Sequence, residues 1–171
     1  MSSCLTAMPR MQQLLTCAFA AVLAVAAVAA ETGAFWSNAT LTNPADGRAI
    51  EYRYVKEFAP GFEPSSMPAR FTFVWRYESA NGMPSASERE SMQRLEDLLS
   101  SRLTSTGGAA LVLVSTGENV RRWIYYAKSQ EAFLVQLNLA LAQAPRFPME
   151  MHAANDREWS SYKAFRQALQ E

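Results

Sequence analysis

The chain has 171 residues, and its 16 basic side chains balance its 16 acidic ones, so its formal net charge is zero. This length supports one domain with a hydrophobic core, since 49% of the residues are hydrophobic and 11% are aromatic. A near-neutral charge argues against a dedicated nucleic-acid-binding protein, which needs a basic surface to neutralise phosphates. It also provides no polybasic attraction to anionic membranes.

The amino-terminal residues have the features of a secretion signal. The basic residue Arg10 is followed by residues 14–30, an uncharged apolar run of 17 residues. Val28 and Ala30 are small side chains at the third and first positions before a cut at Glu31, and signal peptidase recognises this pattern. The alternative is an anchor that stays attached, because the apolar run is at the short limit for a membrane span.

We therefore expect residues 1–30 to be a cleavable signal peptide and residues 31–171 to form a single globular domain. The alanine-rich signal is typical of a bacterial precursor, so the expected location is periplasmic or secreted, with membrane contact only during export. Both cysteines, Cys4 and Cys17, lie in the signal. The mature domain would then contain no disulfide and no thiolate metal site, and its stability would come from packing.

Three strands are expected before the first helix. Residues 35–42 are expected to form a short strand or an extended lead-in, and residues 49–58 alternate in the manner of a half-exposed strand. Prolines and glycines within residues 59–69 predict a loop. Residues 70–79 alternate most clearly, and one side of this strand carries Phe71, Phe73, Trp75 and Tyr77.

The first helix is expected over residues 86–104, because Ser85 and Glu88 form a capping box ahead of an apolar stripe. Residues 109–115 are nearly all apolar, which is typical of a central strand, and a hairpin turn joins them to a strand over residues 120–128. The remaining expected elements are a helix over residues 130–143, a strand over residues 146–153 and a last helix capped by Asn155 or Asp156.

This order of elements predicts an α+β fold. From Arg70 onward the pattern is βαββαβ followed by a helix, which is the pattern of a ferredoxin-like sandwich with two helices on one face of an antiparallel sheet. The strand over residues 49–58 is expected to extend that sheet as an N-terminal addition, and the last helix is an addition at the C-terminus.

Several segments resemble one family in their order and spacing. They are the strand Phe71–Tyr77, the turn Gly82–Pro84, the hairpin strand Arg122–Tyr126 and the pattern Asp156-x-x-Trp159-x-x-Tyr162. Together they resemble the bacterial family known as domain of unknown function 695, over about residues 49–166. More distantly, the domain is similar to the ferredoxin-like inhibitor of ribonuclease E, which binds protein. An exported chain would not meet that cytoplasmic enzyme, and the family itself implies no activity.

Two groups of residues are candidates for binding. Asp156, Trp159 and Tyr162 spread over one side of the last helix and could form a ledge for a ligand, although a helix cap with two aromatic anchors in the core is the simpler interpretation. Trp75 and Trp123 could lie on an exposed aromatic sheet face, but cross-strand packing in the core is favoured. The candidates for the exposed side of the sheet are Arg53, Arg76, Glu78 and Arg122.

The sequence indicates no catalytic or metal site. His152 is the single histidine, and the chain lacks a G-x-S-x-G elbow, an H-E-x-x-H helix and a P-loop. No catalytic residue, metal ligand or cofactor is therefore predicted. Glu96 and Asp97 are expected on a solvated face of the first helix.

The favoured function is a non-catalytic exported module that binds an unknown protein or small molecule and no nucleic acid. The first alternative is a periplasmic enzyme with a pocket between the last helix and the sheet, built from His152, Asp156 and Tyr162. The second is a structural subunit that forms a homodimer through a free sheet edge.

Overall fold

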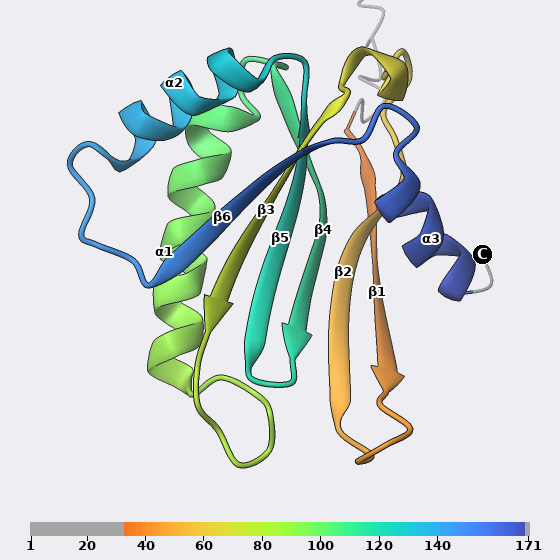
Figure 1. The fold of residues 1–171 in the computed structure, drawn as a ribbon, viewed down its shortest axis with the longest axis vertical. Coiled ribbons are helices and arrows are strands. Elements are labelled where there is room, and N and C mark those ends of the chain that lie inside the picture. Colours follow the sequence, from red (N-terminus) through yellow and green to blue (C-terminus); the bar gives the residue numbers. More distant parts are fainter. Residues whose placement is uncertain (1–32, 170–171) are drawn as a thin grey trace, which may run out of the picture. The chain divides into compact units, whose positions relative to one another are not determined.

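The structure is a computed structural model that describes residues 33–169 (Figure 1). Residues 1–32, 170 and 171 lie outside the described part, so the signal peptide over residues 1–30 and its cleavage stay predictions. The described residues form an α+β domain with a six-stranded antiparallel sheet and three α-helices.

The elements follow the predicted order. The strands are β1 (Phe35–Thr42), β2 (Ala49–Glu57), β3 (Ala69–Arg76), β4 (Ala109–Gly117), β5 (Val120–Ala127) and β6 (Met149–Asn155). The helices are α1 (Ala86–Leu103), α2 (Gln130–Leu141) and α3 (Ser160–Ala168), and a short 3-10 helix spans Pro64–Ser66. The strands are arranged β1-β2-β4-β5-β3-β6 with every neighbouring pair antiparallel. β2 therefore extends the sheet, as predicted, and the structure places it beside β4.

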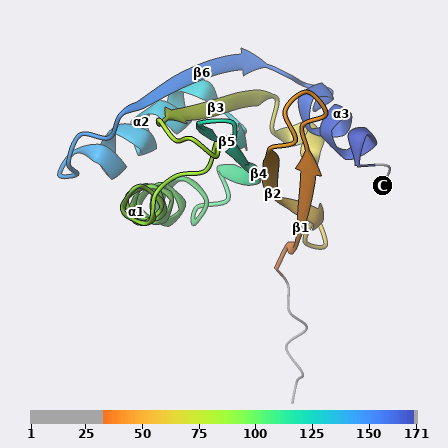
Figure 2. The same cartoon turned by 90° about the horizontal axis from the view of Figure 1, so that it is seen from below.

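Helices cover both faces of this sheet (Figure 2). α1 and α2 cover one face over a buried cluster that includes Phe71, Phe73, Trp75, Tyr77, Trp123 and Tyr125. α3 covers part of the other face over a second cluster that includes Tyr54, Met67, Leu113, Tyr126, Trp159 and Tyr162. β4 contributes to both clusters, which explains why nearly all of its residues are buried. The predicted aromatic face of β3 and β5 is thus confirmed as core.

Local sequence patterns correctly predicted the start of α1 and the turn between β4 and β5. Ser85 accepts a hydrogen bond from the Glu88 amide while the Glu88 carboxylate accepts one from the Ser85 amide, so the capping box of α1 is confirmed. The β4–β5 hairpin turns through Glu118 and Asn119, whose φ angles of 53° and 61° are those of a type I′ turn. Such a turn matches the twist of its flanking strands.

Other boundaries differ from the prediction. β3 ends at Arg76, and the next residue, Tyr77, donates a hydrogen bond from its hydroxyl to the Gly82 carbonyl at 2.9 Å in the loop before α1. β6 begins at Met149 and continues to Asn155, and α3 starts only at Ser160. Pro145 and Pro148 explain the late start of β6, since Pro cannot donate to a strand ladder.

Candidate functional site

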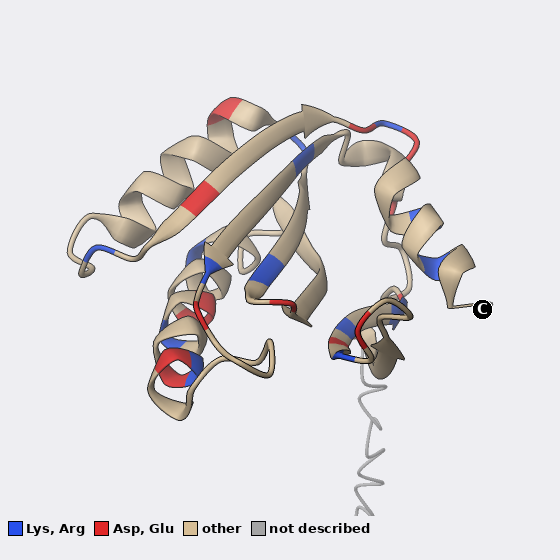
Figure 3. Cartoon of the chain, turned by 60° about the horizontal axis from the view of Figure 1, so that its bottom comes forward, with Lys and Arg blue, Asp and Glu red and all other residues tan. Residues whose placement is uncertain are grey.

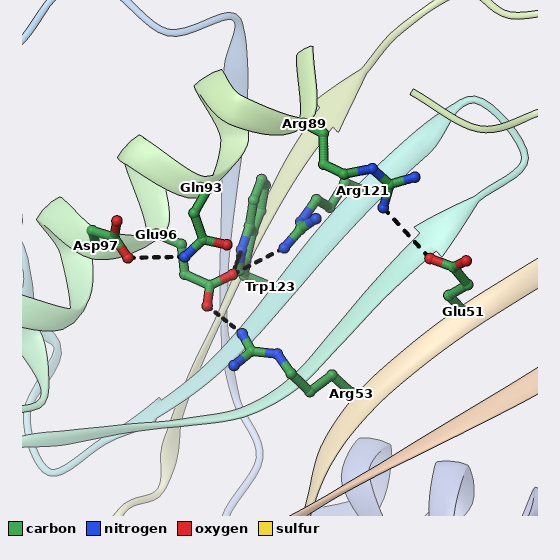
Figure 4. Close-up of polar contacts among 8 residues, drawn as sticks. All are labelled: Glu51, Arg53, Arg89, Gln93, Glu96, Asp97, Arg121 and Trp123. Atoms are coloured by element: carbon green, nitrogen blue, oxygen red, sulfur yellow. Dashed lines mark hydrogen bonds and ion pairs between the residues drawn. The ribbon is translucent and has the colours of Figure 1, made fainter. Parts of the chain in front are cut away.

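Glu96 is the centre of an ionic cluster between α1 and the sheet (Figure 4). Its Oε2 atom accepts hydrogen bonds from Nε1 of Trp123 at 2.8 Å and from Nη2 of Arg121 at 3.1 Å. Its Oε1 atom accepts a hydrogen bond from Nη2 of Arg53. Glu96 is only 5% exposed, and a buried carboxylate is tolerated when several donors compensate its lost hydration.

Arg121 is the buried cation of this cluster. It is 8% exposed, and burial lowers the pKa of its guanidinium below the ordinary value, although the Glu96 carboxylate opposes that shift. Its Nε atom is buried and has no hydrogen-bond partner among the described residues. The guanidinium also lies over the Trp123 ring, 5.1 Å from the ring centroid. The Glu96 carboxylate therefore compensates the buried positive charge of Arg121.

Arg53 links β2 to α1 and remains partly open to solvent. In the sheet it lies opposite Val114 of β4 and Asn38 of β1, and its side chain is 40% exposed. Its guanidinium lies over the Trp36 ring of β1, 4.8 Å from the ring centroid. A charged group is thus presented on the rim of a mostly apolar region.

β2 and β4 separate beside this cluster. Their ladder ends where Tyr54 lies opposite Leu113, whereas β2 continues along β1 to Glu57. β4 also has a register shift between Leu111 and Leu113 relative to β5, and such bulges bend a strand. The two strands therefore form a fork that begins at Tyr54.

A pocket of about 880 Å³ lies in this fork, and we call it the fork pocket. Its apolar lining includes Trp36, Val55, Phe58, Phe62, Met67 and Leu111. Its polar groups come from Arg53, Glu63, Glu96, Ser100, Thr104 and Lys128. Small-molecule sites have volumes of roughly 300–1,000 Å³ and combine an apolar lining with a few polar groups. The fork pocket has this character.

A smaller hollow of about 160 Å³ lies on the other side of the ionic cluster, lined among others by Glu51, Arg89 and Arg121. Nη1 of Arg89 lies 3.6 Å from Oε2 of Glu51, so an ion pair joins α1 to β2 there as well (Figure 4). Basic and acidic side chains are interspersed along α1 (Figure 3). The contacts between α1 and β2 are therefore paired charges.

Asp156, predicted as a candidate binding residue, caps α3. Its Oδ1 atom accepts from the Ser160 amide at 2.7 Å, and its Oδ2 atom accepts from the Ser161 amide at 3.1 Å and the Tyr126 hydroxyl at 2.7 Å. Burial raises the pKa of Asp156, but the hydrogen bonds from Tyr126 and from the two amides outweigh it and lower the pKa to about 2. The contacts of Asp156 therefore hold the helix start.

Trp159 and Tyr162, the other two candidates on this helix, are 3% and 5% exposed. Trp159 donates from Nε1 to the Met67 carbonyl at 3.0 Å and stacks on Tyr126 with ring centroids 3.9 Å apart. The Tyr162 hydroxyl donates to the Val55 carbonyl. Val55 lies beyond the last β2–β4 pair, so Tyr162 supplies a donor to a carbonyl that no longer pairs with β4.

The three candidates on the sheet lie in different environments. Trp75 and Trp123 are buried under α1 and α2, with exposed fractions of 5% and 0%. Arg76 is exposed, and its Nε atom lies 3.5 Å from Oε1 of Glu150 on β6. The aromatic candidates therefore serve the core, and Arg76 remains at the surface.

The residues of the predicted enzyme site make separate contacts. His152 lies on β6 with 64% of its side chain exposed, and its Nε2 atom lies 3.5 Å from Oε2 of Glu150. Asp156 binds the start of α3, and Tyr162 binds β2. Within residues 33–169, no group of three or more His, Cys, Asp and Glu side chains is arranged to hold a metal ion.

Two expectations about which side chains face solvent are wrong, and both concern the ionic cluster. Glu96 was expected on a solvated helix face, but it is buried. It lies four residues after Met92 and three before Leu99, both fully buried, so helical periodicity was the available signal. Arg53 was expected on the open side of the sheet, but it faces α1 and binds Glu96.

Replacing Asp156 with Asn is expected to reduce the acid sensitivity of the fold. The folded-state pKa of about 2 lies below the ordinary 3.8, so the carboxylate stabilises the fold above about pH 4, and this contribution is lost as the pH falls towards 2. Its size is about 1–2 kcal/mol. Urea unfolding at pH 7 and pH 3 should show a smaller pH effect in Asp156→Asn than in the wild type.

Asp97→Asn, at an exposed position of α1, is the matched control for Asp156→Asn and should keep the wild-type difference between the two pH values. An equal pH effect in Asp156→Asn and the wild type would contradict the capping role.

Comparison with known proteins identifies a family for this chain. Residues 36–166 match the Family of unknown function (DUF695), and the search of curated proteins finds no match. The distant similarity to the ribonuclease E inhibitor therefore stays an expectation. The matched segment contains the ionic cluster, most of the lining of the fork pocket, and the α3 anchor, by which we mean Asp156, Trp159 and Tyr162. Because the match covers most of the sequence, the chain belongs to the Family of unknown function, DUF695.

Proposed function

We propose that this domain is an exported, non-catalytic binding protein that holds a small amphipathic ligand in the fork pocket. The observation that carries the proposal is the pocket itself, because about 880 Å³ of mostly apolar space is bordered by Arg53 and Lys128. An apolar ligand body would gain from burial against this lining. A negatively charged or strongly polar group of the ligand would lie near Lys128, because the Arg53 guanidinium is already paired with Glu96.

The backbone of β4 adds polar groups to the pocket. Residues 109–111 pair with β5 on one side, whereas the β2 ladder stops at Leu113. On their β2 side, the backbone groups of residues 109–111 thus have no strand partner in the described part of the chain. A ligand with an amide or carboxyl group could use them as hydrogen-bond partners, since buried backbone groups need partners.

Export rests on the sequence of residues 1–30 alone. Within residues 33–169, no helix combines the length and the apolar character that a membrane span requires. We also propose that the β3–β6 part is ferredoxin-like. The strand order β4-β5-β3-β6 and the position of α1 and α2 on one face support this.

A fluorescent amphipathic probe tests the binding proposal. We expect 1-anilinonaphthalene-8-sulfonate, which has an apolar ring body and one anionic group, to bind saturably with one site per chain. Ala59 lines the pocket, so Ala59→Trp should fill part of the space and weaken binding about tenfold or more. Fluorescence titration measures both affinities.

Ala142→Trp is the control, because Ala142 is exposed and lies at the end of α2, outside the pocket lining. This variant should bind the probe as the wild type does. Equal weakening by both variants, or the absence of saturable binding to the wild type, would rule out the fork pocket as the binding site.

A further inference from the structure

β6 is an edge strand whose outer side pairs with no other strand among residues 33–169. It pairs with β3 on one side and is the last strand of the sheet (Figure 1), and most of its residues are exposed. Met151 is 37% exposed, which is high for a large apolar side chain. An edge strand presents a row of backbone donors and acceptors that another strand can pair with.

The ladder with β3 determines which backbone groups of β6 face outward. The Asp156 amide donates to the Pro68 carbonyl at 2.8 Å, and this pair continues the β3–β6 register without a shift. Hydrogen-bonded pairs alternate in an antiparallel ladder. Ala154, His152 and Glu150 therefore bond to β3, and the amide and carbonyl of Met151 and Ala153 point to the open side.

We propose that β6 pairs antiparallel with β6 of a second copy of this chain, around a two-fold axis at Met151. In this register Met151 lies opposite Met151 of the other copy, and Ala153 lies opposite Met149. Glu150 lies opposite His152 of the other copy, and this pair occurs twice because the interface is symmetric. The paired strands would join the two sheets into one.

Complementary hydrogen-bonding side chains favour the second copy and this register. A two-fold axis perpendicular to the sheet places equivalent side chains of the two copies on the same face of the joined sheet. Moving this axis by one residue along β6 shifts the pairing of the two strands by two residues. The register centred on His152 would place the two histidines opposite each other and Glu150 opposite Ala154. The Met151 register instead brings the Glu150 carboxylate opposite the His152 imidazole, whose N–H can donate a hydrogen bond to it, and such cross-strand pairs stabilise a sheet.

The charged surroundings of Glu150 are compatible with this arrangement. Within one chain its carboxylate lies 3.5 Å from Nε of Arg76 on β3 and 3.5 Å from Nε2 of His152 on β6. The Met149 amide is bonded to the Phe147 carbonyl, which leaves about four new backbone hydrogen bonds per dimer. An interface of this size predicts a weak, reversible dimer.

Disulfide trapping tests the register. In the proposed pairing the two Met151 Cα atoms are about 5.5 Å apart, within the range that a disulfide spans. Met151→Cys, in a chain that also carries Cys4→Ser and Cys17→Ser, is therefore expected to form a covalent dimer on mild oxidation. The reaction should be at least about tenfold faster than for His152→Cys in the same background.

Val135→Cys is the control for random collision, because Val135 is 55% exposed on α2 and lies outside the proposed interface. Trapping of His152→Cys in preference to Met151→Cys would overturn the register. Equal rates for Met151→Cys and Val135→Cys would overturn the dimer.

Sedimentation of the protein without added cysteines supplies an independent measurement. We expect concentration-dependent association below about 1 mM, weakened about tenfold by His152→Glu, which places like charges opposite each other. The double variant Glu150→His, His152→Glu should restore association, because each glutamate again lies opposite a histidine of the other copy. Monomer at all concentrations, or no rescue by the double variant, would overturn the proposal. The fork pocket lies elsewhere in the sheet, so its failure and that of the dimer are distinguishable.

Discussion

Glu96→Gln is expected to lower the free energy of unfolding by about 3 kcal/mol. The variant keeps the shape of the side chain but removes the charge that compensates Arg121, which is 8% exposed. Removing one partner of a buried ion pair leaves an uncompensated charge, at a typical cost of about 3–5 kcal/mol. The partial exposure of Arg53 places the expected value at the lower end, because solvent already screens that part of the cluster.

The measurement is urea unfolding at neutral pH. Adding Arg121→Met to Glu96→Gln should recover part of the loss, because the buried cation is then removed as well. Glu90→Gln is the matched control, since Glu90 is exposed on the same helix, and it should change stability by less than about 0.5 kcal/mol. Equal stability of Glu96→Gln and Glu90→Gln would show that the cluster does not compensate a buried charge.

Trp159→Ala is expected to cost about 3–5 kcal/mol, the range for truncating a buried aromatic side chain. Trp159 anchors the start of α3 to the sheet by stacking on Tyr126 at 3.9 Å and by packing edge-on against Phe58 and Phe62. It also donates to the Met67 carbonyl at 3.0 Å. Loss of these contacts would leave a cavity that the surrounding aromatic rings fill only in part.

Chemical denaturation measures this cost, and Trp159→Phe separates its two sources. The Phe variant keeps most of the apolar area but removes the donor to Met67, so it should lose less, about 1–3 kcal/mol. Phe35→Ala is the control, because Phe35 is 61% exposed and should contribute little. A similar loss for Phe35→Ala and Trp159→Ala would refute the anchoring role of Trp159.

The α3 anchor and the ionic cluster around Glu96 differ in how far the sequence could predict them. The α3 anchor was visible as Asp156-x-x-Trp159-x-x-Tyr162, and its interpretation as a cap with two docked aromatic side chains agrees with the structure. The ionic cluster was missed, because its members are distant in the sequence. Glu96 is separated from Arg53 by 43 positions and from Arg121 by 25, and each alone is typical of a solvated surface.

The amino-acid sequence by itself determined the order and type of the elements, the cap at Ser85, the β4–β5 turn and the apolar face of β3. These features depend on neighbours within one or two turns of chain, where periodicity and backbone preference decide the outcome. Only the tertiary structure decided that α3 covers the second face, that β2 separates from β4 at Tyr54, and that Glu96 is buried. Those outcomes depend on side chains far apart in the chain, whose desolvation is compensated only once the sheet and helices have brought them together.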